Sequence, residues 1–368
     1  MKPTDISLSF IHGLGSKAIR QLFDIITDSE ELYHMTHKQL VELFRSHDDI
    51  ISAIESRSAL QRAEQELELA KKSHIDVLFF TDPDYPKRFN QAGCEDTSIV
   101  LYRLGCCDLN PRYSVGLVGS RKCTQYGLQT TTRLVNEMRS CHPLIVSGLA
   151  YGIDTAAHAA ALDNGLPTVA ILGHGLDQIY PSQNRDLARR IIEHGGALLT
   201  EYPLYSRINA GNFPARNRLV AALSDAIVVT ESAERGGALI TANIATGYHR
   251  DVFAVPGRVT DVSSDGCNAL IASNKAIMIR NAGDLFYQTG WDNTFSRQRQ
   301  HEQQLALFAT LTKEEQQVID VLAHSSELSM EEICEKSSLP LPKIASAILN
   351  LELKKAIVCL PGRLYKAL

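Results

Sequence analysis

Six short apolar segments between Tyr113 and Val255 alternate with stretches whose apolar residues recur at helical spacing. The segments are Tyr113–Val118, Leu144–Val146, Thr168–Leu172, Ala197–Leu199, Ala226–Val229 and Val252–Val255. A repeated strand–helix alternation predicts an α/β fold with a parallel sheet covered by helices on both faces. Because parallel strands point the same way, the turns that follow them meet along one edge of the sheet. The sequence therefore predicts one composite ligand site at that carboxyl edge.

Helical patterns flank this core on both sides. Near the start, Gly13-Leu14-Gly15 has the spacing of a helix-hairpin-helix turn, whose amides can face a phosphate. A plain helical turn with glycine caps explains the same residues, and we favour it. Near the end, three helical stretches and two short strands, Ile357–Leu360 and Leu364–Lys366, describe a winged helix that could bind DNA, bind protein or be structural. The predicted parts are a helical region over 1–75, a core over 76–290, a polar linker over 291–309 and a winged helix over 310–368.

Composition limits the classes of protein that fit this pattern. The chain of 368 residues is 44% hydrophobic and 21% charged, and no run reaches the roughly 18 apolar residues of a membrane span. The start lacks the profile of a secretory signal, so we expect a cytoplasmic protein without membrane contact. Eight cysteines occur without a C-x-x-C pair, which argues against a disulfide framework and a metal site. The net charge of −5 disfavours a general coating for nucleic acid but allows a local basic groove.

The first two predicted turns carry groups suited to phosphate. Gly119-Ser120-Arg121-Lys122 combines free amides at a helix start with a hydroxyl and a guanidinium. Ser147-Gly148 follows the next strand, and Asp154 is placed to cap the helix over 155–162. Neither G-x-G-x-x-G nor G-x-x-x-x-G-K-[ST] is present, so a dinucleotide or ATP cofactor loses its main support and we expect no cofactor.

The later turns add arginines and flat rings. No acidic residue lies between Glu201 and Asp225, whereas Phe213-Pro214-Ala215-Arg216-Asn217-Arg218 puts two arginines into a predicted first helical turn. Cations are unfavourable there unless an anion pairs with them, so we expect an anion site. Phe213 and Tyr202 offer faces for stacking bases, and Gly236-Gly237 opens another helix. Glu201 and Glu231 are the carboxylates at strand ends that could serve acid–base chemistry; no partner for His174 can be assigned.

At these residues the chain resembles the DprA/Smf family of DNA-processing proteins. The resemblance is carried by GLVGSRKCTQYG, IVSGLAYGIDTAAHAAAL, GHGLDQIYPSQN, LLTEYP, FPARNRLVAALSD, ERGGALITANIA, VFAVPG and GCNALIASNKA, about 170 residues in the family's order. It implies a Rossmann-like core, an N-terminal domain of sterile-alpha-motif or helix-hairpin-helix type and a C-terminal winged helix. It also implies a cytoplasmic homodimer that binds single-stranded DNA, protects incoming DNA and loads the RecA recombinase during natural transformation. The implied DNA-contact loops contain Gly119, Ser120 and Arg121, then Arg216, Asn217 and Arg218, then Gly236 and Gly237.

The chain departs from the family pattern in the glycine turn and in Asp96-Thr97-Ser98, where the family tends to have a double proline, and one rival function remains. Ala238 stands where the family often has a serine, which removes a hydroxyl from the glycine turn. The rival is a nucleotide-binding enzyme similar to the LOG-type phosphoribohydrolases, which use P-G-G-x-G-T-x-x-E. Here the turn reads Arg235-Gly236-Gly237 through Thr241-Ala242-Asn243, without a glutamate after the glycines, so we expect a binding protein rather than an enzyme.

Overall fold

The computed structural model describes residues 1–45, 47–291, 312–323, 328–337, 339–353, 356–360 and 364–367. Contacts divide the chain into two compact units, Met1–Trp291 and Asp292–Leu368. Apart from Trp291, the expected linker over 291–309 lies outside the described residues. Within the described part of the chain, no helix combines the length and apolarity needed to cross a bilayer.

The first unit is built on a nine-stranded sheet in the order β1-β2-β6-β5-β4-β3-β7-β8-β9. Its strands are β1 Asp76–Phe79, β2 Val100–Gly105, β3 Ser114–Gly119, β4 Leu144–Ser147, β5 Thr168–Leu172, β6 Ala197–Thr200, β7 Ala226–Glu231, β8 Asp251–Ala254 and β9 Ile277–Met278. The six predicted segments are confirmed as β3 to β8, and they run parallel. β2 pairs antiparallel with both β1 and β6, so it alone runs against the rest.

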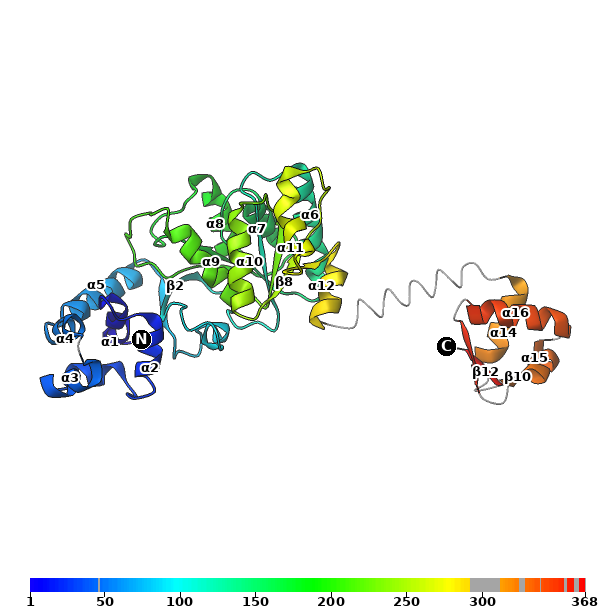
Figure 1. Cartoon of the computed structure of the whole chain (residues 1–368), viewed down its shortest axis with the longest axis horizontal. Helices are drawn as coiled ribbons and strands as arrows, with labels where there is room; N and C mark the ends of the chain where they lie inside the picture. The colour runs from blue at the N-terminus through cyan, green and yellow to red at the C-terminus, as the bar shows by residue number, and fades with distance from the viewer. Residues whose placement is uncertain are drawn as a thin grey trace. The chain divides into compact units, whose positions relative to one another are not determined.

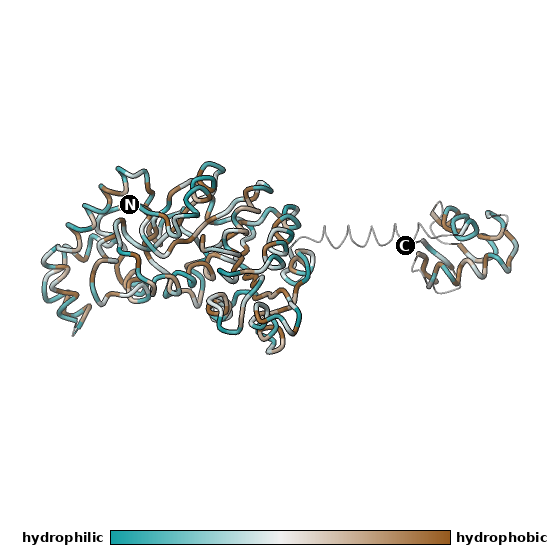
Figure 2. The backbone as a smooth tube through the Cα atoms, turned by 90° about the horizontal axis from the view of Figure 1, so that it is seen from above, coloured by the Kyte–Doolittle hydropathy of each residue, from teal (hydrophilic) through white to brown (hydrophobic). Residues whose placement is uncertain are grey.

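Helices cover both faces of this sheet (Figure 1). One face carries α6 Gln125–Glu137, α7 Ile153–Asp163 and α8 Arg185–Glu193, and the other carries α9 Asn212–Leu223, α10 Gly237–Gly247 and α11 Asp265–Ala272. Strand side chains alternate between the two faces: Ala170 and Leu172 pack in the cluster that contains α8, whereas Val169 and Ile171 pack with α9 and α10. The buried strands are accordingly apolar along most of their length, and Figure 2 shows brown hydrophobic stretches running through the larger unit.

The N-terminal helices share a hydrophobic cluster with one face of the sheet. They are α1 Pro3–Ser7, α2 Ser16–Leu22, α3 His37–Phe44, α4 Asp48–Glu55 and α5 Ser58–Lys72, the blue helices beside β2 in Figure 1. Ile6, Leu40 and Ile54 belong to the same cluster as Leu198 of β6. The α5 carboxylate of Glu66 also accepts a 2.7 Å hydrogen bond from the amide of Leu204. The helical region and the core therefore form one compact unit.

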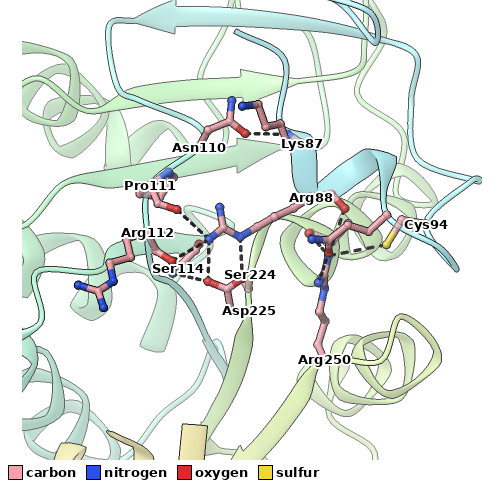
Figure 3. Close-up of polar contacts among 12 residues, drawn as sticks. Lys87, Arg88, Cys94, Asn110, Pro111, Arg112, Ser114, Ser224, Asp225 and Arg250 are labelled. Carbon is pink, nitrogen blue, oxygen red and sulfur yellow. Dashed lines mark hydrogen bonds and ion pairs between the residues drawn. The ribbon is translucent and has the colours of Figure 1, made fainter. Parts of the chain in front are cut away.

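The connection between β1 and β2 is fixed at the amino edge of the sheet by Arg88. Its guanidinium makes two 2.7 Å bonds to the carboxylate of Asp225, directly before β7, and Asp225 accepts a third bond from the amide of Ser114 in β3. Figure 3 shows this pair together with Arg250, which donates to the carbonyl of Arg88 at 3.1 Å. Bidentate, largely buried pairing of this kind is structural, so these two arginines are already bound within the protein.

The second unit contains α14 Lys313–Ala323, α15 Met330–Ser337, α16 Leu341–Leu353 and a sheet in the order β10-β12-β11. The strands are β10 Leu328–Ser329, β11 Ile357–Leu360 and β12 Leu364–Ala367, so β10 adds a third strand to the two that were predicted. Thr312 and Glu315 form a capping box at the start of α14: the amide of Thr312 donates to Glu315, whose amide donates back to the Thr312 hydroxyl. An apolar cluster around Val318, Ile344 and Leu351 gives this winged helix its own core. Lys354, Lys355 and residues 361–363, between β11 and β12, lie outside the described residues.

Candidate nucleic-acid interface

The carboxyl ends of β3 to β8 and the loops that follow them form the candidate site. β3 is the middle one of the seven adjacent parallel strands, with β4 to β6 on one side and β7 to β9 on the other. The order reverses between β3 and β7, and in open α/β sheets ligands bind in the crevice outside such a reversal. The groups that occupy this crevice therefore decide which ligands fit.

The protein itself fills the crevice between β3 and β7. The buried carboxylate of Glu231, at the end of β7, accepts a 2.9 Å bond from the amide of Thr124, the N-cap of α6, and a second bond from the Thr124 hydroxyl. A Cβ on Gly127 would come within 2.6 Å of the same carboxylate. The N-terminus of α6, where dinucleotide-binding folds hold a pyrophosphate, thus already holds an internal anion. Glu231 is a structural group and is not free for acid–base chemistry.

The β3 and β4 loops pack tightly against each other beside this crevice. Gly152, before α7, has φ +76°, and a Cβ there would collide with the carbonyl oxygen of Ser120. This close approach holds the β3 loop in place and directs its tip to solvent. Arg121 and Lys122, which the sequence places in a phosphate-binding turn, are both exposed. Ser120 is partly exposed, and its hydroxyl accepts a 3.1 Å bond from the amide of Lys122.

Arg216 differs from its expected position at the surface. Only 4% of the residue is exposed, and its Nη1 donates to the carbonyl oxygens of Gly148 (2.6 Å) and Ile171. The reason is that α9 starts at Asn212, earlier than predicted, so Arg216 lies in the second helical turn and faces the ends of β4 and β5. The anion expected for this arginine is replaced by strand-end carbonyl oxygens, and the residue supports the core.

Ser147 and Gly148 are likewise buried, although the sequence predicts that they contact DNA. The Ser147 hydroxyl donates to the carbonyl of Leu117 at 2.6 Å. The Arg216 guanidinium lies against Gly148 so closely that any side chain would collide with it, which explains the glycine. Both residues therefore shape the β4 loop from inside the protein.

Asp154 fixes the same loop rather than capping its own helix. Gly152 is the N-cap of α7, and Asp154 Oδ2 instead accepts 3.2 Å bonds from the amides of Gly148 and Ala150. Burial raises the pKa of the Asp154 carboxyl, and the charge of Arg216 counteracts part of that rise. The prediction that Asp154 caps α7 is therefore wrong, and Asp154 is instead a buried residue that fixes the β4 loop.

The remaining arginine of the predicted motif is also paired internally. Arg218 forms an ion pair with Glu201 at the end of β6, and the two side chains are 21% and 12% exposed. Burial raises the pKa of Glu201, while Arg218 lowers it. Asn217 is partly exposed, and its side-chain oxygen accepts a 3.3 Å bond from Nε of Arg216. Both carboxylates that the sequence suggested for acid–base chemistry are therefore engaged inside the protein.

A cluster of one cation and two rings stands at the ends of β3, β5 and β6. The Arg121 guanidinium lies 5.6 Å from the ring centroid of Phe213, at the start of α9. The Phe213 ring lies 5.4 Å from that of Tyr180, in the loop after β5, at an interplanar angle of 41°. Tyr180 is 46% exposed, so this arrangement offers an aromatic face and a positive charge to solvent. The sequence identified Arg121 and Phe213 but missed Tyr180, which lies 33 residues earlier in the chain than Phe213.

Exposed cations without a carboxylate partner lie in the loops and helix starts along this edge. They are Arg121, Lys122, Arg185, Arg207, Arg235 and Arg258. Among the described residues, none of the six lies within the 4.0 Å of a carboxylate that defines an ion pair. In the loops after β3, β5 and β6 and at the start of α8, four exposed cations stand against the exposed Asp177 and Asp186; after β7 and β8, Glu234 and Asp261 offset the charge. Positive potential is therefore concentrated on the β3 to β6 side of the edge.

The glycine turn at β7 adds backbone donors. α10 begins at Gly237, and its N-cap Gly236 provides no side-chain cap. Gly237 is exposed, and a Cβ added there would meet no atom within 4 Å. The first amides of α10 are therefore accessible to an anion.

Two histidines of this unit are buried, His174 in the loop after β5 and His158 in α7. His174 Nδ1 lies 2.9 Å from the carbonyl of Gly175, and its Nε2 accepts from the amide of Tyr180, so both ring nitrogens are used. His158 in α7 is fully buried, and burial lowers its pKa to about 3. The part of the chain that the structure describes holds no group of three His, Cys, Asp or Glu side chains placed to bind a metal ion.

Comparison with known proteins agrees with this architecture. The family described as "DNA recombination-mediator protein A" matches residues 76–290, and the "DprA winged helix domain" matches residues 304–363. The "Protein Smf" of Synechocystis is 39% identical over 219 residues, which are 58% of this chain but only 54% of that protein. The chain therefore spans about half the length of this relative.

Two solved structures show the same fold. DNA processing protein A of Streptococcus pneumoniae matches with a TM-score of 0.65 and 30% identity, over 78% of this chain and 98% of that one. The Helicobacter pylori protein, whose structure concerns its "unique single-stranded DNA binding mode", matches with a TM-score of 0.52 and 31% identity, over 58% of this chain and 95% of that one. Because the family match covers more than half of the chain and both of its main parts, the chain belongs to the DprA/Smf family of DNA recombination-mediator proteins and carries the DprA winged helix.

Proposed function

We propose that this protein binds single-stranded DNA across the carboxyl edge of its sheet and acts as a recombination mediator. The observation that supports this most directly is the group of exposed, unpaired cations beside the Arg121–Phe213–Tyr180 cluster. Guanidinium groups and helix amides bind phosphates, and open ring faces stack bases of any sequence. The described single-strand binding of the Helicobacter pylori relative is consistent with the same use of this fold.

In this proposal the protein works without a chemical step of its own. Glu201 and Glu231 are bonded internally, and both ring nitrogens of His174 are occupied, so the edge offers anchoring groups rather than an acid–base pair. It would act in the cytoplasm as a homodimer, protecting incoming single strands and loading RecA onto them during natural transformation. The family assignment supports these roles.

The defining experiment compares strand types. In competition against a labelled oligonucleotide, the unlabelled single strand should displace it at lower concentration than a duplex of the same sequence. Affinity should fall by about 0.7 log units per log unit of salt for each phosphate contacted. Equal affinity for both forms would contradict the proposal. Release of free base from nucleoside monophosphates would instead favour the phosphoribohydrolase reading.

A further inference from the structure

Tyrosines project from the loops at the carboxyl edge in unusual number. Five tyrosines of the described chain are more than 40% exposed: Tyr126, Tyr151, Tyr180, Tyr205 and Tyr287. Four of them belong to loops or helix starts at this edge, and three follow the adjacent strands β4, β5 and β6. A solvent-exposed tyrosine ring does not gain the free energy that large aromatic side chains obtain from burial. Several such rings at a candidate site therefore indicate that a ligand covers them.

The loops that carry these three tyrosines are bonded to one another. The Tyr151 hydroxyl in the β4 loop donates to the side-chain oxygen of Gln183, three residues after Tyr180 in the β5 loop. The Tyr205 amide in the β6 loop donates at 2.8 Å to Asp177, also in the β5 loop. The three tyrosines therefore belong to loops that hydrogen bonds hold together. Such pre-organisation lowers the entropy cost of binding.

Phe213 connects this row to the cation at the end of β3. Its ring centroid lies 5.6 Å from the Arg121 guanidinium and 5.4 Å from the Tyr180 ring centroid. The 41° angle between the rings of Phe213 and Tyr180 means that they do not cover each other's faces. Arg185 and Arg207 are exposed in the segments that follow Tyr180 and Tyr205, which places a free cation close in sequence to each ring. Rings alternating with free cations match the chemistry of a single strand, whose bases stack and whose phosphates pair.

The spacing of the strands sets how many bases can be engaged. Neighbouring strands lie about 4.8 Å apart, so the ends of β4 and β6 are separated by about 10 Å. Stacked bases are about 3.4 Å apart. Three rings distributed over that width would contact different nucleotides of an extended strand rather than one base.

We propose that Tyr151, Tyr180 and Tyr205 form a base-stacking track that carries single-stranded DNA from the Arg121–Phe213 cluster across the ends of β4, β5 and β6. This inference rests on the proposed function. It assigns the contacts with DNA bases to these three tyrosines, which lie outside the phosphate-binding turns. The track supplies a base-dependent but sequence-tolerant part of the affinity. The exposed cations supply the salt-dependent part.

The test separates bases from phosphates with two probes: oligothymidine, and an abasic oligonucleotide with the same number of phosphates. The parent protein should prefer oligothymidine. Each single substitution, Tyr151→Ala, Tyr180→Ala or Tyr205→Ala, should weaken oligothymidine binding about tenfold and leave abasic binding and the salt slope unchanged. Tyr180→Phe and Tyr205→Phe should restore affinity because they keep the ring; Tyr151→Phe is left out because it removes the hydrogen bond to Gln183.

The control is Tyr287→Ala. Tyr287 is 77% exposed on α12 (Ala282–Thr289), which is followed by Trp291 stacked on Tyr113, just before β3 at the opposite edge of the sheet. This variant should bind both probes like the parent. Tyr205→Ala, at the most exposed of the three track positions, guards against misfolding as an explanation. Equal losses on both probes, or unchanged oligothymidine binding, would overturn the track, whereas a parent that binds neither probe would overturn the proposed function itself.

Discussion

At the scale of single residues, burial divides the arginines of this protein into two classes. Arg88, Arg216 and Arg218 are bonded to carboxylates or carbonyl oxygens inside the fold. Arg121 and Arg207 are exposed and have no ion-pair partner among the described residues. Sequence alone cannot make this distinction, because the FPARNR motif shows charge but does not show which helical turn holds it. One residue of difference in a helix start rotates a side chain by about 100°.

This division predicts opposite effects for two substitutions to alanine. Arg121→Ala should weaken single-strand binding about tenfold or more and lower the salt slope by about 0.7, with little change in the free energy of unfolding. Arg216→Ala should lower the free energy of unfolding by about 2–4 kcal/mol, because two buried carbonyl oxygens lose their donor and Asp154 loses a buried counter-charge. Urea denaturation and fluorescence anisotropy measure the two quantities.

The matched control is Arg139→Ala, which removes the same charge from an exposed position. Arg139 follows α6, whose 13 residues place it about 20 Å from the edge where that helix begins. This variant should keep both stability and binding. If Arg121→Ala bound DNA like Arg139→Ala at moderate salt, the cluster would not be part of the interface.

At the scale of elements, the alternation of apolar and helical segments was sufficient to predict β3 to β8, because each strand is buried on both faces and reads as an apolar run. β2 and β9 were not predicted. β2 follows a segment rich in turn-forming residues, and β9 has only two residues, both exposed, so neither shows a strong pattern. The turn after β3 follows directly from the end of an apolar run, whereas the internal bonds of the β4 loop depend on α9, which lies more than 60 residues away in sequence.

One buried contact joins three elements and gives a pH-dependent prediction. His158 Nδ1 in α7 lies 2.7 Å from the hydroxyl of Thr168 in β5, which donates at 2.8 Å to the carbonyl of Ile145 in β4. The Thr168 hydroxyl proton is already donated to Ile145, so Nδ1 of His158 must donate to the Thr168 oxygen. The neutral His158 ring therefore carries its proton on Nδ1 and none on Nε2. That Nε2 has no hydrogen-bond partner in the structure. Protonation would place a charge in a buried site, which is why the pKa falls to about 3.

The pKa of His158 is lower in the folded protein than in the unfolded chain, where it is about 6.5. Below pH 6.5 the unfolded chain therefore binds a proton that the folded protein does not, and stability falls as the pH drops toward 3. Between pH 7.5 and 5.5 the parent should lose about 1.4 kcal/mol of unfolding free energy through this residue. His158→Gln should lack that part of the loss in urea denaturation at the two pH values. His12→Gln, a substitution at an exposed histidine, should behave like the parent. Identical pH dependence in all three proteins would show that His158 does not titrate as inferred.

At the scale of the whole molecule, the β9 end of the sheet is the candidate for self-association. β9 is an edge strand, and its Ile277 and Met278 are 42% and 48% exposed. Val259 and Val262, in the loop after β8, are 91% and 73% exposed. An apolar edge strand with unpaired backbone groups favours pairing with another chain. We therefore expect a symmetric dimer formed through this end, which would place two DNA-binding edges on one particle.

Light scattering at tens of micromolar should give twice the 40.6 kDa mass of the chain, and the double substitution Ile277→Asp with Met278→Asp should return it to the monomer mass. Ile25→Asp, at an apolar residue 70% exposed in the N-terminal region, is the control and should remain dimeric.

Dissociation should weaken binding to strands long enough to reach both edges but leave the affinity for short oligonucleotides unchanged, because linked sites raise the effective concentration of the second contact. A parent protein that scatters as a monomer would refute the dimer. A double variant that stays dimeric would move the interface away from β9, and equal losses for short and long strands would mean that β9 contacts the DNA itself.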